Sequence, residues 1–300
     1  MSRVFDALQR SGTEQSGIEY PDLMSMVTQV FEAPQQNPPL AEAAAATAAE
    51  QPPILAPAAP EKPVSALNSF PSLKVQVTAA SRLVFFSEPD SLAAEKFRFL
   101  GVRLRQLQQT RNLKKILITS TIPEEGKSMV SANLAGVLTR KKQKVLLIEG
   151  DLRRPVMARQ FGLGRLAGLG EWLQGEPRAL SNIYYLDGPN FWLMPAGDPP
   201  ANPLELMQSG RLSHLMEQLS GLFDWIVVDS PPLLPLADTT VWARLTDGTL
   251  LVAREGKTEK KQLLRGLEAL KKSDLLGVVL NGCQHTGDKN YYQRYAPTSK

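Results

Sequence analysis

Short apolar runs alternate with amphipathic stretches between residues 83 and 280. Apolar runs that stop at polar residues predict strands, and apolar residues that recur every three or four positions predict helices. The expected strands cover residues 116–120, 145–149, 191–194, 225–228, 249–253 and 275–280. The expected helices cover residues 91–108, 128–140, 155–161, 202–220 with a break near Gly210, and 258–271.

Most of these strands are apolar on both faces and are separated by helices. Such strands are buried on both sides, which is typical of a parallel sheet covered by helices. Ser91 is a favourable N-cap, and Pro203 after Asn202 suits the first helical position. The sequence therefore predicts an α/β fold with an open, mainly parallel sheet flanked by helices.

The beginning of the chain has a different composition. Residues 33–63 contain 11 Ala and 8 Pro but only four charged residues. Proline at this density interrupts helices, so we expect a disordered N-terminal extension. Within that extension, residues 2–10 predict one short amphipathic helix. We divide the chain into an N-terminal segment (1–32), an Ala/Pro-rich linker (33–81), an α/β domain (82–286) and a C-terminal tail (287–300).

Composition narrows the class of protein. The 300 residues are 43% hydrophobic and 21% charged, which supports a sizeable core and excludes wholesale disorder. No run of about 20 apolar residues occurs, so we predict no membrane span. The lone cysteine, Cys283, suits a reducing compartment, which predicts a cytoplasmic protein. The net charge of +4 comes from dispersed residues, so we predict no nucleic-acid partner.

A phosphate-binding loop is predicted between the first strand and the following helix. Residues 121–128 end in Gly126-Lys127-Ser128, although Thr121 replaces the first glycine of the strict pattern. Unpaired backbone amides at the helix start bind phosphate oxygens. Lys127 is expected to reach the β- and γ-phosphates of ATP, and Ser128 to ligate Mg²⁺. The expected nucleotide-binding residues are Pro123, Glu124, Glu125, Gly126, Lys127, Ser128 and Met129.

Acidic residues follow two further strands. Glu149 ends the strand at 145–149 and Asp151 comes two residues later, while Asp229 follows the strand at 225–228. Ligands of open parallel sheets bind beyond the carboxyl ends of the strands, so we expect these acids to meet the phosphate loop. Phosphoryl transfer requires carboxylates that hold Mg²⁺ and a group that accepts a proton. We therefore predict Lys127, Glu149, Asp151 and Asp229 as catalytic residues, with Ser128, Asp151 and Asp229 as metal ligands.

The acids at the strand ends, Arg153 and Asn281 each have a second interpretation. An acid at a strand end can simply cap the next helix. Arg153 can stabilise phosphate charge or pair with a nearby acid. Asn281 can hydrogen-bond adenine or cap a turn with Gly282. Arg153 and Asn281 are nevertheless included in the predicted nucleotide site.

The motifs resemble those of the bacterial tyrosine kinase (BY-kinase) family, specifically its stand-alone members linked to exopolysaccharide and capsule synthesis. The loop resembles the family's proline-containing Walker A motif. Asp151-Leu-Arg153-Arg154-Pro155 and Asp229-Ser-Pro-Pro232 resemble its second and third Walker motifs. The resemblance spans residues 82–295 and implies a P-loop NTPase-type fold. Where the family has the first aspartate of its second Walker motif, this chain has Glu149, which could serve as proton acceptor or metal-shell ligand.

The C-terminal tail has the tyrosine-rich character of the family. Three of the six tyrosines lie within the last ten residues, and we predict Tyr291, Tyr292 and Tyr295 as phospho-acceptors. The resemblance implies an ATP- and Mg²⁺-dependent autokinase in which the tail of one subunit enters the site of another. The resemblance also implies that this autokinase regulates the polymerisation and export of exopolysaccharide or capsule.

The resemblance also implies partners. These are an activating membrane-embedded chain-length regulator (a polysaccharide co-polymerase), a counteracting tyrosine phosphatase and further copies of this chain. The membrane partner would recruit the protein to the inner face of the plasma membrane. Ring assembly in the family uses a Glu-x-x-Arg-x-x-Arg motif, which here reads Glu95, Arg98 and Gly101.

Two other functions compete with the kinase. A partitioning-type P-loop ATPase carries a lysine four residues before the last loop glycine, where this chain has Ile122. A nucleotide-binding regulatory subunit would retain the loop and lose the chemistry, which a changed residue such as Glu149 would indicate.

Overall fold

The computed structural model describes residues 67, 70–77, 81–175, 179–271 and 273–283. The predicted helix at 2–10, the Ala/Pro-rich stretch at 33–63 and the tail tyrosines lie outside the described residues.

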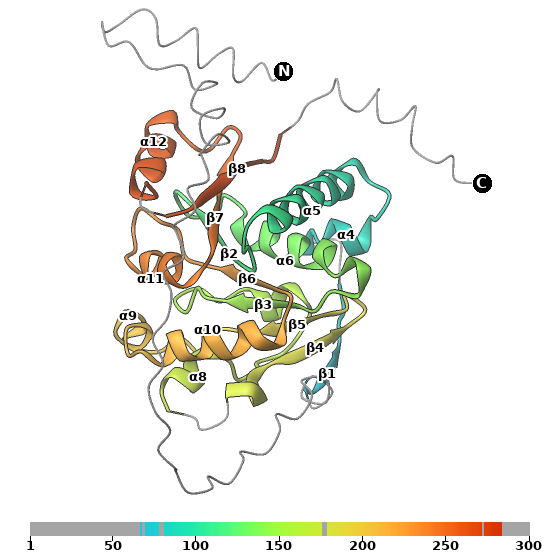
Figure 1. The fold of residues 1–300 in the computed structure, drawn as a ribbon, viewed down its shortest axis with the longest axis vertical. Coiled ribbons are helices and arrows are strands. Elements are labelled where there is room, and N and C mark those ends of the chain that lie inside the picture. The colour runs from blue at the N-terminus through green and yellow to red at the C-terminus, as the bar shows by residue number, and fades with distance from the viewer. Residues whose placement is uncertain (1–66, 68–69, 78–80, 176–178, 272, 284–300) are drawn as a thin grey trace, which may run out of the picture. The chain divides into compact units, whose positions relative to one another are not determined.

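Eight strands form one sheet in the order β1-β4-β5-β3-β6-β2-β7-β8 (Figure 1). Neighbouring strands pair in parallel, except that β4 and β5 are antiparallel. The predicted mainly parallel α/β sheet is therefore confirmed. The strands are β1 (Ser72–Lys74), β2 (Lys115–Ser120), β3 (Val145–Glu149), β4 (Tyr184–Asp187), β5 (Phe191–Met194), β6 (Trp225–Asp229), β7 (Gly248–Arg254) and β8 (Leu275–Asn281).

Helices cover both faces of the sheet, as Figure 1 shows. The α-helices are α4 (Val84–Ser87), α5 (Leu92–Thr110), α6 (Lys127–Leu138), α7 (Met157–Gln160), α8 (Leu169–Leu173), α9 (Pro203–Met207), α10 (Arg211–Leu222), α11 (Asp238–Leu245) and α12 (Lys260–Ala269). The described residues also include the short 3₁₀ helices η2 (Arg140–Lys142) and η3 (Ala179–Asn182). Among the described helices, none combines the length and apolar character needed to cross a bilayer.

The core has one layer on each face of the sheet. Helices α5 and α6 pack on one face, where Leu104 and Leu134 are buried against strand residues such as Ile118. Helices α8, α10 and α11 pack on the other face, where Trp242 and Leu215 are buried. Strands β2, β3 and β6 lie between both layers, which explains their continuous apolar sequences.

Several local features differ from the predictions. Strand β1 lies inside the predicted linker 33–81, yet it pairs with β4, so the ordered sheet begins before residue 82. Strand β4 and helices α4, α8 and α11 were not predicted. The expected helix at 202–220 is two helices, and the break near Gly210 is confirmed because Gly210 adopts φ +79° between α9 and α10.

Candidate active site

The phosphate loop joins β2 to α6 and has an unusual backbone. Gly126 is the N-cap of α6 with φ +92°, and Glu124 also adopts a left-handed conformation with φ +65°. A Cβ atom on residue 126 would lie 2.1 Å from Nδ2 of Asn281. Glycine is therefore required at position 126 for both its backbone angle and its close contact.

Lys127 lies close to all three predicted metal ligands. Its Nζ is 3.1 Å from Oδ2 of Asp151, 3.8 Å from Oδ2 of Asp229 and 3.3 Å from Oγ of Ser128. Asp151 follows β3 and Asp229 ends β6, and these strands are direct neighbours. The parallel arrangement thus brings together four of the residues that the sequence pattern singled out.

Burial controls the charges of this cluster. Asp229 is fully buried, which raises the pKa of its carboxyl against the opposing effect of Lys127. Ser131 donates to Oδ1 of Asp229 at 3.1 Å, but Oδ2 has no hydrogen-bond partner. Burial alone would lower the pKa of Lys127, but Asp229 and Asp151 outweigh it and raise that pKa. Lys127 therefore remains a cation at neutral pH.

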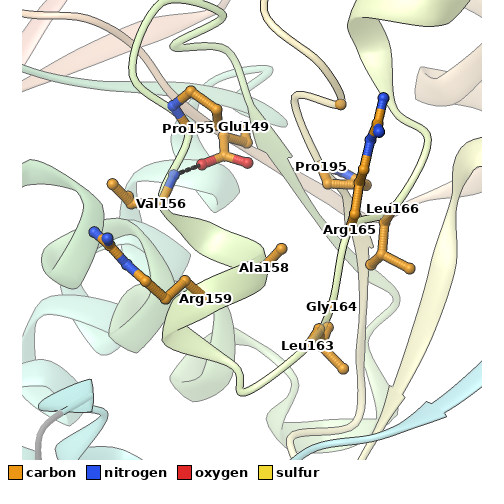
Figure 2. Close-up of a pocket in the computed structure, with 11 residues that line it drawn as sticks. Glu149, Pro155, Val156, Ala158, Arg159, Leu163, Gly164, Arg165, Leu166 and Pro195 are labelled. Atoms are coloured by element: carbon orange, nitrogen blue, oxygen red, sulfur yellow. Dashed lines mark hydrogen bonds between the residues drawn. The ribbon is translucent and has the colours of Figure 1, made fainter.

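Glu149 is directed away from this cluster. Its Oε1 accepts the backbone amides of Val156 and of Met157, the latter at 2.7 Å, and its Oε2 accepts the amide of Ala196 at 3.0 Å. Figure 2 shows the contact with Val156. No hydrogen bond or ion pair described for Glu149 joins it to Lys127. This geometry matches the alternative in which the acid caps the next helix.

A cavity of about 310 Å³ lies beside Glu149 (Figure 2). Its walls are mainly apolar, and Arg159 and Arg165 also contribute to its lining. Burial raises the pKa of Glu149, while the three backbone amides act in the opposite direction. Glu149, which borders the cavity, joins the end of β3 to α7 and to the segment after β5.

Arg153 pairs with an acid that sequence reasoning missed. Its Nε and Nη2 bind the buried carboxylate of Asp238 at 2.7 and 3.1 Å, and this contact raises the pKa of Arg153. The structure therefore places Arg153 in an ion pair with α11, which was the second interpretation of this residue. Asp151 accepts the backbone amide of Arg154 at 3.1 Å, which orients the acid.

The ends of β7 and β8 hold the phosphate loop from one side. Asn281 donates from Nδ2 to the carbonyl of Glu125 at 2.9 Å, so in this structure its amide contacts the loop backbone. Arg254 donates to the carbonyl of Glu124 at 3.2 Å, and Lys257 pairs with the Glu124 carboxylate at 2.6 Å. Arg254 and Lys257 were not predicted, because no sequence motif places them beside the loop.

The remaining predicted site residues differ in exposure. Pro123 and Glu124 are exposed, whereas Glu125 is fully buried and Met129 is partly buried.

The Glu95 and Arg98 side chains of the ring-type motif pair with each other at 2.7 Å. Their third motif position is the buried Gly101, where a Cβ would lie 3.2 Å from Val137 of α6. A side chain at position 101 would require Val137 to shift by a few tenths of an ångström.

The strand–loop–helix unit with Gly126, Lys127 and two neighbouring acids defines a P-loop nucleotide-binding protein. No family model matches the chain. The tyrosine-protein kinase YwqD of Bacillus subtilis (strain 168) is 35% identical over 202 residues, which cover 67% of this chain and 85% of YwqD. The putative tyrosine-protein kinase CapB of Staphylococcus aureus is 30% identical, covering 72% of this chain and 95% of CapB.

Similarity in three dimensions agrees with similarity in sequence. The kinase domain of Escherichia coli tyrosine kinase ETK aligns with a TM-score of 0.64 and 31% identity, covering 67% of this chain and 79% of that domain. The chain therefore belongs to the bacterial tyrosine-protein kinase family, and it is a tyrosine-protein kinase.

Proposed function

We propose that one copy of this chain phosphorylates the C-terminal tail tyrosines of another copy, using ATP and Mg²⁺. The observation that carries the proposal is the position of Lys127, which lies within 4 Å of two acids at neighbouring strand ends. A lysine next to a helix N-terminus binds the transferring phosphate, and acids beside it hold the metal ion. Tyr291, Tyr292 and Tyr295 are the proposed acceptors.

The residues around Asp229 suit a magnesium ion. Its Oδ2 is buried and lacks a hydrogen-bond partner, which is the kind of oxygen that a hard cation binds. The described residues contain no cluster of three or more His, Cys, Asp or Glu side chains that could hold a metal ion. Magnesium needs fewer, because it is usually held by one or two carboxylates together with substrate phosphates and water. Ser128, Asp151 and Asp229 would hold it, and it would supply charge neutralisation on the phosphates.

The chain's own groups then have separate tasks. The amides at the start of α6 and the Lys127 ammonium bind and orient the phosphates of ATP. The two carboxylate oxygens of Asp151 contact Lys127 and the Arg154 amide, which hold this acid beside the phosphate site. Buried charges around the phosphates act more strongly than charges in water.

Labelled ATP tests this function directly. Purified protein incubated with γ-labelled ATP and Mg²⁺ should acquire phosphotyrosine in the tail. To test transfer in trans, a Lys127→Met chain with an intact tail is mixed with an active chain whose tail tyrosines are Phe. Phosphotyrosine on the Lys127→Met chain supports transfer between copies. If the Lys127→Met chain stays unlabelled in this mixture, transfer between copies is contradicted.

The proposal extends to regulation and location. Phosphate on the tail adds negative charge and should weaken its attraction to an acid-lined site on another copy. We propose a cytoplasmic protein that self-associates, and that a membrane-embedded chain-length regulator activates and recruits to the inner face of the membrane. A tyrosine phosphatase would reverse the modification, and the cycle would regulate polymer synthesis and export.

One observation favours a second function, a nucleotide-binding regulatory subunit with little kinase activity. The carboxylate of Glu149 is bound to three backbone amides, although related kinases are expected to have an aspartate there. The labelling experiment separates the two functions. Bound but unreacted ATP would indicate the regulatory subunit.

A further inference from the structure

Glu125 is a carboxylate buried inside the phosphate loop. It is 0% exposed, whereas the preceding Glu124 has a side chain that is 81% exposed. A buried charge is costly unless hydrogen bonds satisfy it. The Glu125 carboxylate accepts the Thr121 hydroxyl on both oxygens at 2.8 Å, the Ile122 amide at 2.9 Å and the Thr258 hydroxyl. Three donors thus surround one acid.

These donors come from two parts of the chain. Thr121 and Ile122 begin the loop and Glu125 lies near its end, so their hydrogen bonds close the loop on itself. Thr258 lies between β7 and α12, and its hydroxyl also accepts the Arg254 amide at 2.7 Å. The carboxylate therefore fastens the loop to the adjacent part of the domain.

Thr121 explains how this chain tolerates the loss of the first loop glycine. Its side chain is fully buried, and a Cβ on Gly266 of α12 would lie only 2.5 Å from its Cγ2. Gly266 therefore makes the space that the threonine methyl group occupies. The hydroxyl that comes with this side chain is one of the three donors to Glu125.

We infer that Glu125, held by Thr121 and Thr258, is a positioning residue that keeps the phosphate loop in its nucleotide-binding shape before ATP arrives. The inference rests on the proposed function. The Glu125 carboxylate is buried and binds the Ile122 amide of the loop, so Glu125 acts through the loop backbone. Preorganisation of this kind lowers the cost of binding, so its loss should weaken affinity more than it slows the chemical step.

Paired threonine variants test the inference. Thr258→Val removes the hydroxyl and Thr258→Ser keeps it, while Thr139→Val removes a hydroxyl at the far end of α6 as a matched control. We expect Thr258→Val and Glu125→Gln to weaken Mg-ADP binding about tenfold, which corresponds to about 1.4 kcal/mol. Thr258→Ser and Thr139→Val should bind like the wild type. In Thr258→Val, the value of kcat at saturating ATP should stay within about twofold.

Amide hydrogen exchange gives a readout that does not need nucleotide. The Ile122 amide donates to Glu125, so it should exchange faster in Thr258→Val and Glu125→Gln than in Thr258→Ser. Thermal unfolding of each variant identifies any general loss of structure. Unchanged Ile122 exchange and unchanged Mg-ADP affinity would overturn the inference, as would a lower kcat at unchanged KM. If the wild type bound no adenine nucleotide, the proposed function would fail and the exchange data would still decide this inference.

Discussion

Glu149→Gln tests whether this acid stabilises the fold or takes part in catalysis. In the structure the carboxylate accepts three backbone amides, from Val156, Met157 and Ala196. Glutamine keeps one acceptor oxygen. If that oxygen stays with Val156 and Met157, the new NH₂ group faces the amide of Ala196, so two donors oppose each other in a buried place.

The structure sets the size of the effect. A buried donor left without a partner costs about 1–3 kcal/mol. Burial raises the pKa of Glu149, so removing its charge offsets part of this loss. We expect a net loss of about 2 kcal/mol in the free energy of unfolding. For a domain of this size each kcal/mol lowers Tm by about 2–4 °C, so Tm should fall by roughly 4–8 °C.

The assay compares stability with tail phosphorylation. Glu171→Gln is the matched control, because Glu171 also accepts two backbone amides, of Gly168 and Asp198, both at 2.8 Å. Both variants should lose stability by circular dichroism, and both should retain phosphorylation within about threefold at 20 °C below their own Tm. The reasoning is refuted if Glu149→Gln keeps the wild-type Tm and loses phosphorylation by 100-fold or more, since that result would make Glu149 catalytic.

Three further predictions concern the phosphate site. Lys127→Met should lower tail phosphorylation by about 10²–10³-fold with the fold retained, measured by phosphotyrosine blotting and circular dichroism, and persistent phosphotyrosine would contradict the site. Gly126→Ala should weaken Mg-ADP binding in calorimetry, because its Cβ would lie 2.1 Å from Nδ2 of Asn281 and displace the amide that binds the Glu125 carbonyl of the loop. Gly210→Ala has a similar backbone angle but no atom within 4 Å, so it should cost only about 1–2 kcal/mol of stability and keep binding. Asp229→Asn should remove the extra rise in Tm that Mg²⁺ adds to ADP, and an unchanged rise would exclude Asp229 as a metal ligand.

The sequence predicts the centre of the fold better than its edge. Strands β2, β3 and β6 are buried on both faces, so their apolar runs are long and unmistakable. Strand β1 has only three residues, Ser72–Lys74, and among the described strands it pairs with β4 alone. Strand β4 is likewise short, and its last residue is the exposed Asp187. Such strands depend on contacts from distant parts of the chain, which local periodicity does not record.

The candidate site shows the same limit. Parallel strand order allowed us to predict that acids after β3 and β6 meet the phosphate loop, and Asp151 and Asp229 both contact Lys127. Sequence does not reveal where a side chain points once it reaches that edge. Glu149 and Arg153 each had two interpretations, and only coordinates distinguish a ligand from a cap or an ion pair. Glu125 belonged to a motif, but its donor Thr258 is 133 positions away.

Glu149 and Asp151, at the carboxyl end of β3, have different roles. A glutamate at position 149 reaches the amides of Val156, Met157 and Ala196, whereas an aspartate would be shorter by about 1.5 Å, one carbon–carbon bond, and would fall short of them. The longer side chain thereby fastens α7 and the segment after β5 to the sheet. Asp151 lies two residues later and contacts Lys127, so its position depends on the loop that Glu149 holds. Chemistry in this protein would then rest on Asp151, Asp229 and Lys127, with Glu149 stabilising the loop that carries Asp151.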